Sequence, residues 1–239
     1  MTPHAGGPVI PNFGHASSCV TQNRFFCTDW VRAHWDDTLQ PALVQHVRLS
    51  AIAVSIGFVL AFALALLAYR VRRLDHPIGL ASDFLYTIPS LALFQLLVPI
   101  TGLSVTTVEV ALVSYTLLIL IRNIVAGLAS VPSDVREAAE GMGYSRSRQL
   151  ARVELPLALP VIVAGIRIAV VTTIGLVTVT ALIGQGGLGQ LILDGLYRDF
   201  RTEVVVGSVL CVVLAIVADL VLVGIQRIAM PWTRKGATT

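Results

Sequence analysis

The segment from Leu49 to Tyr69 contains no charged residue. A helix needs roughly 20 mostly apolar residues to cross the hydrocarbon core of a bilayer, and this segment is of that length. It ends in a basic cluster typical of the cytoplasmic end of a spanning helix, made of Arg70, Arg72 and Arg73. Because lipid offers no partners to backbone polar groups, such a run folds as a helix that satisfies its own hydrogen bonds.

Further apolar runs repeat this pattern along the chain. They cover Ile78–Ile100, Val105–Ile121, Pro156–Ile183 and Val204–Ile228. With 55% hydrophobic and 13% charged residues, the chain has too little polar surface to coat a water-soluble globule. Pro89 and Pro99 are expected to kink or interrupt the second run. We therefore predict an all-α polytopic membrane protein with about five spanning helices.

The basic residues indicate how the chain crosses the membrane. With the N-terminus outside and the C-terminus cytoplasmic, most of them lie on the cytoplasmic side, as the positive-inside rule requires. Membrane loops also explain the formal charge of +3, so nucleic-acid binding is not expected. The predicted divisions are an extracytoplasmic tail over 1–48, a membrane domain over 49–228 with a cytoplasmic loop at 130–156, and a cytoplasmic tail over 229–239.

The predicted tail holds aromatic and cysteine residues. Trp30–Arg48 has the mixed composition of an interfacial helix, anchored by Trp30 and Trp35. Cys19 and Cys27 lie in polar sequence ahead of it, where either a small disulfide loop or two unpaired thiols is consistent with the pattern. The tail lacks the apolar core of a cleavable signal peptide, so the first spanning helix is expected to direct insertion.

A polar segment, Glu137–Pro156, stands between the third and fourth spanning helices on the basic side. A helix is expected to start at Pro132 and Ser133, with Ser133 as its cap, and to be stopped by Gly141 and Gly143. A second short helix is predicted over Ser145–Glu154, after which the chain turns into the fourth span. A compact charged insert on one face of a membrane protein is suited to contact with a soluble partner.

Several residues of this insert have fixed spacing: Glu137, Ala138, Ala139, Gly143, Val153, Leu155 and Pro156. They resemble the EAA loop of ABC importer permeases, E-A-A-x3-G-x9-I-x-L-P, with valine replacing isoleucine. The resemblance implies the methionine-permease-like fold of type I importers, and a coupling helix at Glu137–Gly143 that docks in a groove of an ATP-binding subunit. ATP and Mg²⁺ are then expected in that partner, and this chain itself is expected to perform no chemistry and to hold no cofactor.

Other stretches indicate a subfamily of these permeases: Tyr86–Phe94, Arg122–Asn123, Ala164–Arg167 and Ala181–Gly189. They are similar to permeases of osmoprotectant importers, which carry glycine betaine, proline betaine, choline or carnitine. The similarity covers roughly 49–228. It implies a bacterial cell-membrane complex with ATP-binding subunits, an extracytoplasmic substrate-binding protein, and a second copy of this permease or a homologous one. The glycine-rich run within the last stretch then corresponds to a turn and a short gate-like helix at the outer mouth.

The permease of such an importer needs a permissive path for its substrate. A quaternary ammonium group has no N–H to donate, and proteins hold it against aromatic faces. Aromatic rings and the backbone carbonyls freed by a proline kink are therefore the expected lining. The candidate pathway residues are Tyr86, Thr87, Pro89, Ser90 and Tyr115.

Two ionisable residues interrupt the later spans, Arg167 in the fourth and Asp219 in the fifth. At about 1.5 Å per residue, Arg167 lies roughly 16 Å beyond Pro156, and Asp219 lies roughly 12 Å from Arg227. Since charged groups inside a membrane are costly and are normally paired, these compatible depths predict a structural ion pair. Asp83, near the start of the second span, is the alternative partner.

Other chemistries find little support in the sequence. The histidines show no metal-ligand spacing, and the chain has no Walker-type phosphate loop, so neither a metal site nor ATP hydrolysis by that route is expected. A permease for methionine or another amino acid shares the same plan. An ion-coupled secondary transporter needs acids arranged in a relay, whereas Asp83, Glu109 and Asp219 are scattered. A membrane scaffold with another cytoplasmic partner is the third alternative.

Overall fold

The computed structural model describes residues 18–71 and 87–231, together with residues 73, 77, 79, 80 and 84. Its long helices are α3 (Gln40–Arg70), α6 (Val105–Ala129), α9 (Leu155–Val179) and α11 (Arg201–Ala229). With the turns continuous with them, these form four described helical segments that are long and apolar enough to cross a membrane. This part of the chain contains no strand, which agrees with the all-α polytopic prediction.

The expected second span, Ile78–Ile100, lies partly outside the described residues. Its described end is α5 (Ser90–Thr101), a short apolar helix. Pro89 precedes the first residue of α5 with ψ 136°, so the helix is interrupted there, as predicted. Pro99 lies inside α5 without ending it. The boundaries proposed for the tails and loops stay predictions.

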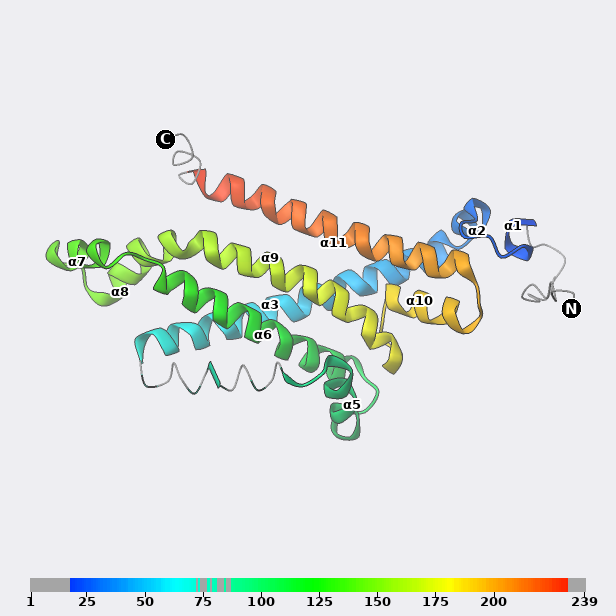
Figure 1. Cartoon of the computed structure of the whole chain (residues 1–239), viewed down its shortest axis with the longest axis horizontal. Coiled ribbons are helices and arrows are strands. Elements are labelled where there is room, and N and C mark those ends of the chain that lie inside the picture. The colour runs from blue at the N-terminus through cyan, green and yellow to red at the C-terminus, as the bar shows by residue number, and fades with distance from the viewer. Residues whose placement is uncertain are drawn as a thin grey trace, which may run out of the picture.

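The long helices run beside one another along the longest axis of the molecule (Figure 1). α6 packs against both α3 and α9, and α11 packs against α9. The short helices α7 (Ser133–Gly141) and α8 (Arg146–Gln149) lie at one end of this bundle (Figure 1). At the opposite end lie the short helices α1 (Ser18–Thr21), α2 (Thr28–Ala33) and α10 (Leu188–Tyr197).

The first spanning helix begins earlier than the sequence predicted. No separate interfacial helix covers Trp30–Arg48; α2 is followed by a π-helical turn, η1 (Trp35–Leu39), that leads directly into α3 at Gln40. Pro41 stands in the first turn of α3, where its missing N–H costs nothing. His46 lies fully buried within this continuous helix, and its Nε2 donates a 2.9 Å hydrogen bond to the Ile174 carbonyl.

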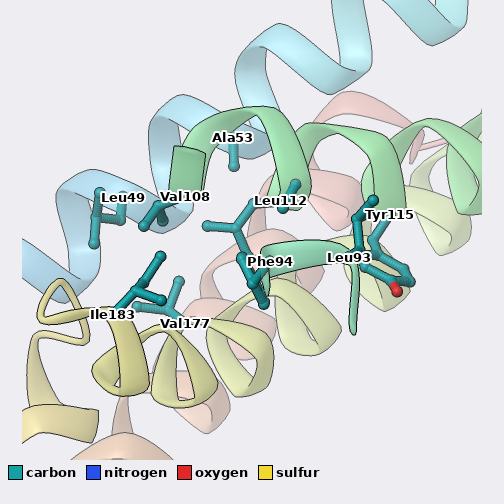
Figure 2. Close-up of a cluster of buried hydrophobic side chains, with 10 residues drawn as sticks. Leu49, Ala53, Leu93, Phe94, Val108, Leu112, Tyr115, Val177 and Ile183 are labelled. Atoms are coloured by element: carbon teal, nitrogen blue, oxygen red, sulfur yellow. The ribbon is translucent and has the colours of Figure 1, made fainter. Parts of the chain in front are cut away.

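Two apolar clusters hold the spans together. Figure 2 shows one of them, in which Phe94 of α5 points between side chains of α3, α6 and α9. Its buried members are Leu49, Ala53, Leu93, Phe94, Val108, Ala111, Leu112, Tyr115, Val177 and Ile183. The second cluster joins small residues of α3, such as Ala61 and Ala65, to leucines and isoleucines of α6 and to α9.

Small residues set the spacing between these helices. A Cβ at Gly57 of α3 would overlap the Thr116 hydroxyl of α6, and a Cβ at Gly165 of α9 would overlap the Asn123 side chain of α6. Lipid provides no hydrophobic drive between helices, so close backbone approach and its van der Waals contacts stabilise the bundle. The core therefore fixes α6 between α3 and α9, and places the loop that follows α6 at one end of the molecule.

Candidate functional site

The polar insert forms a short exposed helix, α7, that projects from the end of the bundle (Figure 1). Glu137 and Ala138 are exposed on it, whereas Ala139 is only 1% exposed and packs inward. Leu155 and Pro156, at the end of the insert, are half-buried. The two neighbouring alanines therefore face different surroundings, one free for a partner and one already in contact with the chain.

The helix ends at Gly141, as the sequence predicted. Gly143 has φ +80°, a left-handed conformation that glycine adopts without strain. Its N–H donates to the Glu140 carbonyl at 2.9 Å, and the Tyr144 N–H donates to the Ala139 carbonyl at 3.1 Å. These bonds satisfy carbonyls that the helix end leaves open and fix the turn.

Two local predictions for the insert were wrong. Ser133 does not cap α7, because the helix begins at Ser133 itself and Pro132 takes the capping position without a side-chain bond. The chain also does not turn at Leu155 and Pro156: α8 continues through a π-helical turn, η2 (Leu150–Glu154), directly into α9. Pro156 stands in the first turn of α9, where proline is tolerated. The end of the insert is thus helically continuous with the fourth span.

Behind α7 lies a polar cluster that the sequence did not indicate. Glu154 is 4% exposed, and its Oε1 accepts a 3.0 Å hydrogen bond from Gln149 Nε2. Arg136, the residue before Glu137, donates from a terminal nitrogen to the Leu128 carbonyl at 2.8 Å. Both side chains line a cavity of about 830 Å³ that also borders Tyr69 and Arg70 at the end of α3.

The candidate pathway residues do not all line one space. Tyr86 lies outside the described residues. Tyr115 is 8% exposed, and its hydroxyl donates to the Ile88 carbonyl at 2.5 Å, next to the break at Pro89. Thr87 is exposed, with its hydroxyl donating to the Phe84 carbonyl at 2.7 Å, and Ser90 begins α5. The structure thus joins Tyr115 to the proline break, and the carbonyl freed there is already occupied.

Arg167 and Asp219, from α9 and α11, lie in direct contact. Arg167 Nε is 2.7 Å from Asp219 Oδ1, and a terminal nitrogen is 2.8 Å from Oδ2. The alternative partner, Asp83, lies outside the described residues. Two parallel bonds satisfy the carboxylate within an apolar environment, which is the geometry of a structural ion pair. The arrangement offers no reactive group.

The opposite end of the molecule is held by the segment before α2. Cys19 and Cys27 form a disulfide, which decides between the two alternatives left open by the sequence. Within this loop, Asn23 donates to the Asp199 carbonyl at 2.6 Å and accepts from the Arg201 N–H at 2.9 Å. The loop thereby fastens onto the connection between α10 and α11.

The glycine-rich run forms a tight turn before α10. Gly184 and Gly187 have positive φ, and a Cβ at Gly187 would meet backbone and side-chain atoms of α3 near His46. A short helix does follow the run, at the end of the bundle opposite α7 (Figure 1). No group of metal ligands is found among the residues that the structure describes.

The chain is similar to known transport proteins over most of its length. The family described as "Binding-protein-dependent transport system inner membrane component" matches residues 53–235. The chain is 38% identical over 192 residues to the osmoprotectant import permease protein OsmW of Salmonella typhimurium, covering 78% of this chain and 89% of that protein. It is 34% identical over 192 residues to the glycine betaine/carnitine/choline transport system permease protein OpuCD of Bacillus subtilis, covering 80% and 84%.

The fold also has a solved counterpart. A chain of the MetNI methionine ABC transporter, in an inward-facing form, superposes with a TM-score of 0.75 over 82% of this chain and 97% of that chain, at 23% identity. This likeness confirms the predicted fold, with the polar insert between its spans. The chain belongs to the family of binding-protein-dependent transport system inner membrane components.

Proposed function

We propose that this chain is the permease subunit of an ATP-driven ABC importer for osmoprotectants, with glycine betaine, proline betaine, choline and carnitine as the substrate class. The observation that carries the proposal is the exposed helix α7, which presents Glu137 and Ala138 at the end of the spanning bundle. The names of the relatives OsmW and OpuCD support the substrate class. The methionine alternative has only the low-identity fold likeness behind it.

In this proposal the chain performs no chemistry. ATP and Mg²⁺ bind to separate ATPase subunits, and α7 docks in a groove on them. Glu137, Ala138 and Ala139 lie in the docking helix α7, Gly143 forms the turn that follows it, and Leu155 and Pro156 begin α9. Moving a transporter from 1:99 to 99:1 between two states takes about 5.5 kcal/mol of differential binding. Because η2 continues directly into α9, a movement of the insert can be passed to the fourth span.

The proposed assembly lies in a bacterial cell membrane, with the N-terminus outside and α7 in the cytoplasm. A second permease copy or a homologous permease completes the pathway, and an extracytoplasmic substrate-binding protein delivers the substrate. The disulfide between Cys19 and Cys27 supports this orientation, because disulfides persist in oxidising compartments outside the cytosol. α7 and the disulfide loop also lie at opposite ends of the molecule (Figure 1).

The test is reconstitution of the chain with its ATPase subunits and binding protein in liposomes. Glycine betaine, choline or carnitine should stimulate ATP hydrolysis, and ATP depletion should abolish uptake. Glu137→Arg should prevent co-purification of the ATPase, whereas Asp36→Arg, at an exposed acid of the opposite end, should not. Uptake that survives ATP depletion would refute the ATP-driven mechanism. Stimulation by methionine alone would refute the substrate class.

A further inference from the structure

Arg136 connects the docking helix to the ends of three other helical segments. A terminal guanidinium nitrogen donates to the Leu128 carbonyl, in the last turn of α6, at 2.8 Å. The guanidinium carbon lies 6.0 Å from the ring centroid of Tyr69, near the end of α3. Its Nε lies 3.8 Å from Glu154 Oε1 in η2, just before α9 begins. One side chain of α7 therefore reaches α3, α6 and the start of α9.

Glu154 is the buried partner in this cluster. Its side chain is 5% exposed, Gln149 of α8 donates to one oxygen, and the Tyr69 side chain interacts with the carboxylate. Removing one partner of a buried charge pair is strongly unfavourable, because the other charge is left without compensation. The charge on Glu154 is therefore tied to the position of Arg136, and hence to the position of α7.

The contact between the two side chains is only partly made. At 3.8 Å, Nε and Oε1 are too far apart for a hydrogen bond. Among the described residues, neither Arg136 Nε nor Glu154 Oε2 has a hydrogen-bond partner. The adjoining cavity of about 830 Å³ gives both groups room to move. A small displacement of α7 can thus convert the loose ion pair into a two-point pair.

We propose that Arg136 and Glu154 are positioning residues that transmit the movement of α7 to the cytoplasmic ends of α3, α6 and α9. In one state of the cycle the pair is loose, as in this structure, and in the other it closes to a two-point pair. The proposal rests on the proposed function, because it requires an ATPase that moves α7. The role proposed for Arg136 and Glu154 differs from docking, because neither side chain belongs to the exposed surface that carries Glu137 and Ala138.

The experiment uses the complete complex in liposomes, with glycine betaine as the transported probe. Arg136→Met and Glu154→Gln should each leave the amount of co-purified ATPase unchanged. Each should lower the glycine betaine imported per ATP hydrolysed by about ten-fold, within the usual range of coupling between sites. The double variant should lose no more than the worse single variant, because both remove the same connection. The matched control is Arg148→Met, an exposed arginine of the same insert.

Gel filtration and thermal unfolding of each variant check that it folds. If Arg136→Met does not fold, Glu154→Gln carries the test alone, since the amide keeps the shape of the side chain. A wild-type ratio of transport to hydrolysis in the folded variants would overturn the proposal, and so would loss of the ATPase subunits, which would make the pair a docking contact. Failure of the wild-type chain to capture an ATPase would instead refute the proposed function.

Discussion

The guanidinium of Arg167 on α9 donates two hydrogen bonds to the carboxylate of Asp219 on α11, at 2.7 and 2.8 Å. The two side chains are 33% and 31% exposed, so the pair lies at the surface of the isolated chain rather than in its core. Both helices are otherwise apolar around it. The pair therefore satisfies two charges that each helix alone would place in lipid.

Breaking this pair on one side should destabilise the protein. Asp219→Asn or Arg167→Met leaves one polar or charged group without its partner, and each should lower the unfolding temperature in detergent. The double variant Arg167→Met/Asp219→Leu should recover most of the loss, because replacing both charges with apolar groups removes the uncompensated charge. Arg152→Met, at an exposed arginine of the polar insert, serves as the control. Unchanged unfolding of both single variants would contradict a structural role.

Counting residues along two spans was enough to match the depths of Arg167 and Asp219. A membrane gives each apolar run one direction and a known rise per residue, so depth follows from sequence. The same reasoning predicted the four spanning segments that the structure describes, and the interruption at Pro89 followed from the missing N–H of proline. These features depend on one segment at a time and on the surrounding lipid.

The sequence could not predict contacts that join distant segments. Arg136 and Glu154 meet because η2 runs straight into α9, whereas the sequence suggested a turn at Pro156. The state of Cys19 and Cys27 depended on the path of the chain between them. Helix ends were equally hard to place: Ser133 resembles a cap by residue type, but Pro132 occupies that position. The shift at Ser133 is a single residue, within the range over which helix ends commonly differ from a local preference.

The close approach of α6 and α9 at Gly165 should be sensitive to a single methyl group. A Cβ added there would overlap the Asn123 side chain, so Gly165→Ala should destabilise the protein by about 1–3 kcal/mol, the usual cost of overpacking. Gly175→Ala, on the same helix, adds a Cβ that meets nothing within 4 Å and should be tolerated. Chemical or thermal unfolding of both variants measures the difference. Equal stability of the two variants would refute tight packing at Gly165.

Asn23 should fasten the disulfide loop to the connection between α10 and α11. It is 3% exposed, has φ +49°, and bonds to both the Asp199 carbonyl and the Arg201 N–H. Asn23→Ala loses both bonds and disfavours this backbone conformation, which should cost about 1–3 kcal/mol locally. Asn23→Gly loses the bonds but keeps the conformation, so its effect should be smaller.

Hydrogen exchange measured by mass spectrometry can follow this loop. Amide protection near Arg201 should fall in Asn23→Ala and fall less in Asn23→Gly, while the protection of α6 should stay unchanged. A faster exchange spread evenly over the whole chain would mean that the bonds stabilise the global fold rather than the local connection. Equal protection in wild type and Asn23→Ala would refute the fastening role.

Two adjacent alanines of α7 should respond differently to the same substitution. Ala138 is exposed, so Ala138→Leu should leave folding intact and obstruct the close approach of a docked ATPase, lowering its co-purification by about ten-fold, equivalent to 1.4 kcal/mol. Ala139 is 1% exposed, so Ala139→Leu should overpack the insert and lower the unfolding temperature of the permease alone. Pull-down with the purified ATPase and unfolding of the isolated chain separate the two effects. If Ala138→Leu bound the ATPase as tightly as wild type, α7 would not dock through this face.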